Sequence, residues 1–274
     1  PDGTLESLGC KKIILACNGF GGNPELVKDF LPEMRDALYA GHVGNDGSAI
    51  EWGRELGAQL ADLGGYQGHG SWAVPQGALI SWALMMEGAI QINALGERFH
   101  DETQGYSEAA VQVLAQPHGL AWNIFDDTLL KFAQDFPDFS QAQSVGAVHS
   151  FQNMEELSKF VACPVDRLAK TLEKVHAGVD TQTGRIFKRS LSFPLHAIRV
   201  TGALFHTQGG LDLDAGCRVL RTDGSVFPNL LAAGGAARGV SGNAVWGYLS
   251  GNGLLSAIAG GYIAAHSAAS GLRK

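Results

Sequence analysis

The sequence has few charged residues, and its basic residues are spread thinly along the chain. Charged residues make up only 17% of the 274 residues, the formal net charge is −7, and the 20 lysines and arginines form no continuous stripe. Proteins that bind nucleic acid need concentrated basic residues to neutralise phosphates. We therefore expect no nucleic-acid partner.

Long apolar runs and paired cysteines are also missing. No charge-free apolar run reaches the roughly 18 residues that cross a bilayer, so we expect no membrane insertion. The opening PDGTLESLG lacks the basic and apolar segments of a secretion signal. The four cysteines lie far apart without CxxC spacing, which predicts neither a disulfide framework nor a metal site. These features favour a cytoplasmic protein of one large domain or two ordinary ones.

Glycine, in contrast, is abundant, and many of its 37 residues gather in three clusters. The first, NGFGGNP, contains Gly19 and follows an apolar run at 11–18, which predicts a buried strand of a parallel sheet. Asn23 followed by Pro24 predicts a helix start, and Pro32 should end or bend that helix. The cluster is similar to a dinucleotide-binding fingerprint, but Pro24 stands where the third glycine should be. A plain tight turn between strand and helix explains the cluster about as well.

The other two clusters lie near the end of the chain. In NLLAAGGAARG, a strand runs into Gly234 and Gly235, as happens where backbone passes close to a planar or phosphorylated ligand. In GYLSGNGLLSA, the residues Asn252, Gly253 and Leu254 come just before or at the start of a helix expected over 253–269. The free N–H groups and positive end of that helix would stabilise an anionic ligand. Close packing of a small-residue helix is the alternative for this third cluster.

The middle of the chain has a different character. A helix expected over 47–63 is followed, from about residue 69, by a predicted hairpin at 88–99, a strand at 120–126 and amphipathic helices at 154–162 and 166–179. This α+β pattern predicts a middle domain at 69–200, inserted between two segments, 1–68 and 201–274, of one glycine-rich α/β domain.

The order of motifs ACNGFGGNPEL, GNDG, GERFHDE, FHTQGG, LLAAGG and GYLSGNGLL resembles the soluble fumarate reductase and succinate dehydrogenase flavoprotein family, whose relatives include 3-ketosteroid and tricarballylate dehydrogenases. The resemblance covers about residues 11–268. It implies an FAD-binding α/β domain with an inserted α+β cap domain, and a substrate held between cap and flavin. The family's N-terminal GxGxxG unit has no counterpart here. We therefore expect a partial FAD domain, a missing N-terminal half, and poor FAD binding by this chain alone.

The resemblance also implies which residues meet the cofactor. Asp46 of GNDG matches an aspartate near the cofactor, although it could instead cap the helix that follows. Gly253 and Leu254 match positions whose amides face the flavin, and Gly235 stands where the family usually has a glutamate. The full set of expected cofactor-binding residues is Gly19, Asp46, Gly234, Gly235, Asn252, Gly253 and Leu254.

Three residues are the expected catalytic ones. His69 and His206 match two histidines that hydrogen-bond substrate carboxylates in fumarate reductases, although each could be a purely structural histidine. Tyr248 resembles the tyrosine with which 3-ketosteroid dehydrogenases polarise a substrate carbonyl, and packing beneath the flavin is its alternative role.

The two arginines of fumarate reductases are absent. Met85 stands near the place of the proton donor and Tyr248 at that of the carboxylate clamp, while Arg98 is expected to hold the cap through Glu102. The resemblance thus predicts an FAD-dependent oxidoreductase that transfers a hydride between flavin N5 and a carbon–carbon bond beside a carbonyl or carboxyl group. Two alternatives stay open: a dicarboxylate reductase with Arg238 as its clamp, and a catalytically silent fragment or subunit that contacts a partner chain.

Overall fold

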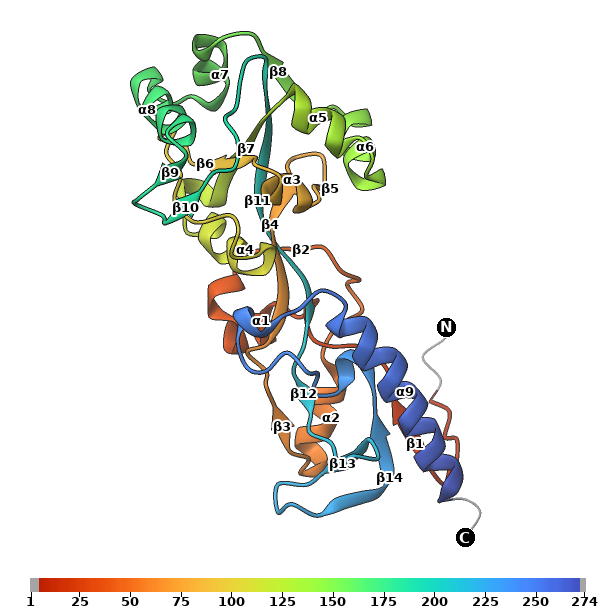
Figure 1. Ribbon diagram of the computed structural model, residues 1–274. Helices are drawn as coiled ribbons and strands as arrows, with labels where there is room; N and C mark the ends of the chain where they lie inside the picture. The colour runs from red at the N-terminus through yellow and green to blue at the C-terminus, as the bar shows by residue number, and fades with distance from the viewer. Residues whose placement is uncertain (1–4, 272–274) are drawn as a thin grey trace. The chain divides into compact units, whose positions relative to one another are not determined.

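The computed structural model describes residues 5–271, which divide into two compact units. Unit 1 comprises the chain up to residue 32, residues 41–67 and the chain from residue 206 on, and unit 2 comprises residues 33–40 and 68–205. The long strands β4 (Tyr66–Ala73) and β11 (Leu195–Thr207) carry the chain from unit 1 into unit 2 and back (Figure 1). That these units are an FAD-binding domain and a cap stays a prediction.

Unit 1 contains a three-stranded sheet that joins distant parts of the chain. Its order is β1 (Ile13–Leu15), β14 (Val226–Ala232), β13 (Arg218–Leu220), with β1 parallel and β13 antiparallel to β14. The remaining elements of unit 1 are α1 (Pro24–Phe30), α2 (Ser48–Leu56), β3 (Leu60–Ala61), β12 (Gly210–Leu211), the 3-10 helices η3 (Gly234–Ala236) and η4 (Val245–Gly247), and α9 (Asn252–Ser270).

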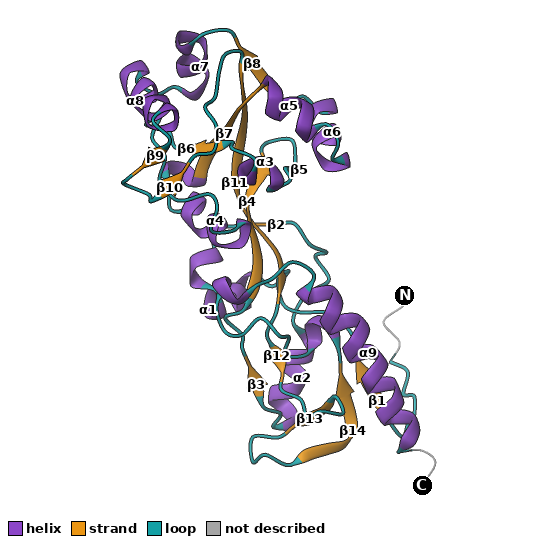
Figure 2. Cartoon of the chain, viewed as in Figure 1, coloured by secondary structure: helices purple, strands orange, loops and turns teal. Residues whose placement is uncertain are grey.

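Alternating side chains of β14 give this sheet two covered faces. Leu230 and Ala232 share a buried cluster with Ala49 of α2, while Leu231 packs with Ala264 of α9. Because side chains of a strand point alternately to opposite faces, α2 and α9 contribute to the cores on opposite sides of β14. Figure 2 shows the long helix α9 alongside β14 and β1.

Two expectations for unit 1 need correction. The predicted helix at 47–63 ends at Leu56, because Gly57 adopts a left-handed conformation (φ 75°) and its N–H bonds back to the last turn. The first strand is not fully buried, since Ile13 and Ile14 are 46% and 36% exposed. In contrast, α1 begins as predicted, with Asn23 accepting hydrogen bonds from the N–H groups of Glu25 and Leu26.

Unit 2 is built on a seven-stranded, largely antiparallel sheet. Five strands follow the order β5 (Ala78–Leu79), β4, β11, β7 (Leu120–Asp126) and β6 (Ile90–Ile92). The two other strands, β2 (Leu38–Tyr39) and β8 (His149–Phe151), each pair with β11. The strands β9 (Val179–Asp180) and β10 (Arg185–Ile186) form a separate pair. The helices are α3 (Ala83–Met86), α4 (Tyr106–Leu114), α5 (Asp127–Ala133), α6 (Pro137–Ser144), α7 (Met154–Val161) and α8 (Val165–His176), with the 3-10 helix η2 (Pro117–Gly119); a further 3-10 helix, η1 (Pro32–Met34), lies where the chain first enters this unit.

The expected hairpin at 88–99 is wrong. Its first half forms β6, but β6 pairs with β7, and the residues after it make a turn closed by the Asn93 N–H and the Glu97 carbonyl. The strand at 120–126 and helix α7 are where the sequence predicts them, and α8 lies at the predicted place but ends three residues earlier than expected, at His176.

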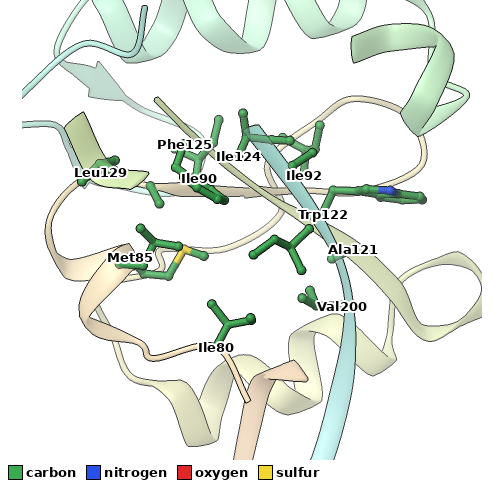
Figure 3. Close-up of a cluster of buried hydrophobic side chains, with 14 of the residues drawn as sticks. Ile80, Met85, Ile90, Ile92, Ala121, Trp122, Ile124, Phe125, Leu129 and Val200 are labelled. Atoms are coloured by element: carbon green, nitrogen blue, oxygen red, sulfur yellow. The ribbon is translucent and has the colours of Figure 1, made fainter. Parts of the chain in front are cut away.

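Apolar side chains of this sheet and its helices form the core of unit 2. Figure 3 shows part of it, with Met85 among Ile80, Ile90 and Phe125. Met85 is fully buried, so in this fold it is a core residue. Within the described part of the chain, no helix combines the length and the apolar character needed to cross a membrane.

Candidate functional site

A cavity of about 700 Å³ opens in unit 1. The end of β11, the turn after β14 and the start of α9 provide much of its wall, and Ile14 of β1 also lines it. Its size lies within the range of small-molecule sites. Six of the predicted site residues line it: His206, Gly234, Gly235, Tyr248, Gly253 and Leu254.

The start of α9 contributes its positive end to this cavity. Gly251 turns the chain into the helix in a left-handed conformation (φ 92°), and the Leu255 N–H makes the first helical bond, 2.9 Å to the Gly251 carbonyl. The N–H groups of the first turn have no intrahelical acceptor. Because Gly253 and Leu254 both line the cavity, the positive end of a 19-residue helix faces its contents.

Glycines after β14 keep another part of the cavity wall free of side chains for two different reasons. Gly234 has φ 62°, a conformation that disfavours other residues, and it has room for a Cβ. A Cβ on Gly235 would instead lie 2.2 Å from Asn18 Oδ1 and 2.8 Å from the Gly19 nitrogen, so Gly235 is needed for close backbone packing.

Gly19 has a similar packing role. A Cβ there would lie 2.1 Å from Thr207 Oγ1, which accepts a hydrogen bond from the Phe20 N–H at 3.1 Å. Gly19 does not line the cavity but fixes the first turn against the end of β11. The contact supports the turn interpretation of the first glycine cluster, and its cofactor role stays a prediction.

His206 and Tyr248 are the polar ring pair of the cavity. Their ring centroids are 6.2 Å apart with an interplanar angle of 84°. A Cβ on Gly253 would lie 2.5 Å from His206 Cε1, so the imidazole packs directly on the helix start. Burial lowers the pKa of His206, against a smaller opposing effect of the Thr207 carbonyl, and the ring is therefore neutral near pH 7.

His69 belongs to unit 2 and is buried there. Its Nδ1 accepts a hydrogen bond from the Ser71 N–H at 3.1 Å, and its ring stacks on Tyr106 with centroids 5.0 Å apart. Burial lowers its pKa to about 3. His69 is thus a neutral imidazole with its proton on Nε2, where it can donate one hydrogen bond.

Asp46 lies on the surface and does not line the cavity. Its Oδ1 accepts hydrogen bonds from the Ser48 N–H at 3.0 Å and the Ser48 hydroxyl at 2.5 Å, and the hydroxyl bond is the main reason for its lowered pKa. These bonds hold the first residue of α2, as the helix-capping alternative expects, although the cap position itself is Gly47. A role for Asp46 beside a cofactor stays a prediction.

Arg238 and Arg98 are both occupied by carboxylates. Arg238 Nε lies 2.6 Å from Asp62 and its Nη1 lies 3.3 Å from Asp212. Arg98 Nε donates to Glu102 at 3.0 Å and Nη1 to Asp180 at 2.6 Å, which confirms the predicted tie between Arg98 and Glu102. Neither arginine lines the cavity.

Sequence reasoning missed two polar residues, Gln208 in the cavity lining and Ser241 behind it. Gln208 and Ser241 are buried, and they connect His206 to Asn252, which is itself buried behind the wall. The sequence signal for Gln208 is its place in the motif FHTQGG, two positions after His206. Ser241 gives no such signal, because only the fold brings it to Gln208.

Comparisons with known proteins identify the family to which the chain belongs. A family model described as FAD binding domain matches residues 2–254. The probable fumarate reductase Ifc3 of Shewanella frigidimarina is 29% identical over 96% of this chain and 45% of its own length. The 3-oxosteroid 1-dehydrogenase of Mycobacterium tuberculosis is 25% identical over 92% of this chain and 52% of its own length.

Solved structures give the same fold. The open conformation of a flavocytochrome c3 fumarate reductase matches 97% of this chain and 47% of its own, with a TM-score of 0.79 and 28% identity. The 3-ketosteroid Δ1-dehydrogenase of Sterolibacterium denitrificans, in complex with 1,4-androstadiene-3,17-dione, matches 95% of this chain and 53% of its own, with a TM-score of 0.72 and 22% identity. This chain therefore spans about half the length of the curated relatives and structures it matches.

Proposed function

The chain belongs to the FAD binding domain family, and from that premise we propose that it is part of an FAD-dependent oxidoreductase that transfers a hydride between flavin N5 and a carbon–carbon bond beside a carbonyl or carboxyl group. The family match and the flavoprotein relatives indicate FAD as the cofactor, as the sequence predicts. The relatives include fumarate reductases and 3-oxosteroid dehydrogenases, and both kinds of enzyme act on carbon–carbon bonds.

The residues around the cavity fit a flavin. Gly234 and Gly235 leave the wall after β14 without side chains, which suits a planar ring system. The Gly253 and Leu254 amides at the start of α9 suit the negative charge of a reduced flavin. When bound, FAD supplies the two-electron acceptor or donor of the reaction. The chain's own part is to hold that group flat and to stabilise its charge.

The observation that supports the substrate assignment is the lack of charge on the surface that unit 1 offers to a substrate beside the flavin. Among the described residues that line the cavity, there is no lysine, arginine, aspartate or glutamate. A site for a dicarboxylate would need cationic groups, because a carboxylate taken out of water without a partner is strongly disfavoured. We propose that Tyr248 donates a hydrogen bond to the carbonyl oxygen of a neutral substrate and stabilises the developing enolate.

The dicarboxylate alternative needs Arg238 to bind a substrate carboxylate, and the existing ion pairs of Arg238 disfavour that role. Its guanidinium is held by Asp62 and Asp212, which also raise its pKa. To clamp a substrate it would have to leave both carboxylates. His69 and His206 are neutral at pH 7, so neither replaces the missing positive charge.

We further propose that the complete protein contains another segment of the FAD domain, which covers the exposed side of unit 1. In the sheet of unit 1, β1 is an edge strand, and Ile13 and Ile14 are partly exposed there. Apart from the cavity lining, helix α9 leaves Leu255, Ile258 and Tyr262 between 54% and 72% exposed. Several large apolar side chains exposed on neighbouring elements are typical of an interface.

The test compares the full-length protein with this chain alone. The full-length protein should purify with bound FAD, whereas the isolated 274-residue chain should retain little FAD after gel filtration. A full-length protein that takes up no FAD would contradict the proposal and favour the catalytically silent alternative. Stoichiometric FAD on the isolated chain would contradict only the part that concerns the additional segment.

A further inference from the structure

A row of buried polar side chains connects the start of α9 to His206. Asn252 Nδ2 donates to Ser241 Oγ at 3.0 Å, and the Ser241 hydroxyl donates to Gln208 Oε1 at 3.0 Å. The Gln208 amide nitrogen then meets the His206 ring. Gln208, Ser241 and Asn252 are only 3%, 4% and 9% exposed. Such a row is costly to bury unless each group is satisfied, so it restrains the geometry of the residues it joins.

The backbone decides which nitrogen of His206 carries the proton. Nδ1 lies 3.1 Å from the carbonyl oxygen of Thr207. A carbonyl oxygen can only accept a hydrogen bond, so Nδ1 must be the donor. In the neutral ring, Nε2 then has no hydrogen and offers a lone pair.

Gln208 contacts this ring in an unusual way. Its Nε2 lies 3.0 Å from His206 Nε2 and 3.3 Å from Nδ1. An atom on the in-plane lone pair of one ring nitrogen would be much farther from the other, so the amide lies across the face of the ring. The amide hydrogens are positive and the ring face is negative, which is an N–H···π contact. Because Gln208 Oε1 is engaged by Ser241, the amide presents these hydrogens to the ring.

This contact favours one charge state. A positive amide edge against the ring face stabilises a neutral imidazole and disfavours an imidazolium. The groups that face the ring add no opposing charge, since its ring neighbour is the phenol of Tyr248 and the described cavity lining holds no acidic side chain. Burial lowers the pKa of His206 in the same direction.

We propose that Gln208 is a positioning residue that holds His206 as the neutral Nδ1–H tautomer, so that the cavity wall presents a lone pair to the substrate. This inference rests on the proposed function, and it deepens the substrate class. A lone pair repels a carboxylate and accepts a hydrogen bond from a neutral hydroxyl, enol or phenol. His206 is then an acceptor in this site, in contrast to the carboxylate donor that the sequence resemblance implies.

The test measures His206 directly, by ¹⁵N NMR of the full-length protein labelled in histidine. In the wild type, the Nδ1 and Nε2 resonances should be those of the neutral Nδ1–H tautomer at pH 7. Gln208→Glu replaces the amide by a carboxylate at the ring and should raise the pKa of His206 by about 1–3 units. Gln208→Met keeps the length of the side chain without its hydrogens and should raise that pKa by less, because only the opposing amide is lost.

Gln67→Glu is the matched control, because Gln67 lines the same cavity but lies on strand β4, whereas Gln208 follows the end of β11. It should raise the pKa of His206 clearly less than Gln208→Glu does. Equal shifts in the two variants would show that charge in the cavity, and not the contact with Gln208, sets the protonation state, and would overturn the inference. An Nε2–H tautomer or an imidazolium in the wild type at pH 7 would overturn it as well. The NMR readout needs no turnover, so a protein without activity would contradict the proposed function and leave this result interpretable.

Discussion

Gly253→Ala tests whether the contact between α9 and His206 matters for the reaction. The new Cβ would lie 2.5 Å from His206 Cε1 and 2.6 Å from Nε2. The ring must therefore move by about 0.9 Å before it reaches the 3.4 Å of an ordinary contact. The Thr207 carbonyl and the Gln208 amide both hold the ring, so this movement breaks the geometry described above.

The expected result is a loss of activity without a loss of stability. Displacement of a site residue by about 1 Å costs up to about 100-fold in rate, so we expect kcat/KM to fall by about 10- to 100-fold. Gly253 is the second residue of α9, where alanine gains at most the roughly 0.5–1 kcal/mol that it gains over glycine in a helix interior, so we expect little change in the free energy of unfolding. The assay is steady-state turnover of the full-length flavoprotein with its own substrate, together with thermal unfolding.

Gly260→Ala is the control within the same helix. Its nearest neighbour would be Ala233 Cβ at 3.6 Å, an ordinary contact, and Gly260 does not line the cavity. It should gain the helix stabilisation and keep full activity. If Gly253→Ala were as active as Gly260→Ala, the packing of His206 on α9 would have no part in the reaction, and the reasoning would be refuted.

Three further predictions concern the buried ion pairs of unit 2 and the proposed substrate donor. Glu102→Gln should destabilise unit 2 by about 3–5 kcal/mol in urea unfolding, because Arg98 and Arg185 lose the carboxylate they share. Burial opposes ionisation of Glu102, but the two arginines hold its pKa at about 2, below the ordinary 4.5. This carboxylate therefore contributes about 3 kcal/mol above pH 4.5, lost as the pH falls from 4.5 towards 2, and unfolding curves of Glu102→Gln should lack that part of the acid sensitivity. Tyr248→Phe should lower kcat by about 10-fold or more while the flavin spectrum and FAD content stay unchanged, and full activity in this variant would remove Tyr248 from the mechanism.

The elements that depend on local signals could be predicted from the sequence. The Asn23–Pro24 pair identifies the start of α1, and the amphipathic spacing identifies α7 and α8. The strand predicted at 120–126 coincides with β7, because Gly119 and the Asp126–Asp127 pair mark the two ends of its apolar run in the sequence. Six of the site residues expected from the motifs line one cavity, although they come from segments up to 48 positions apart, and their roles stay predictions.

Features that depend on distant pairing could not be predicted. The apolar spacing continues past α2, but Gly57 ends the helix and β3 pairs with β12 about 150 residues away. Likewise β6 pairs with β7 and not with the segment that follows it. The orientation of the Gln208 amide toward His206 depends on Ser241, which is 33 residues from Gln208 in sequence. No local pattern carries that information.

The central claim is that the substrate is neutral and not a dicarboxylate, and one stopped-flow measurement tests this claim. The full-length protein is reduced under anaerobic conditions and mixed either with fumarate or with a neutral α,β-unsaturated ketone, while the flavin absorbance is followed. A cavity lined by no described cationic residue lacks the charge-assisted hydrogen bonds that a carboxylate needs, each worth about 1.5–3 kcal/mol. The ketone should reoxidise the flavin at least about 100-fold faster than fumarate does. Reoxidation by fumarate at an equal or higher rate would contradict the proposed preference for a neutral substrate.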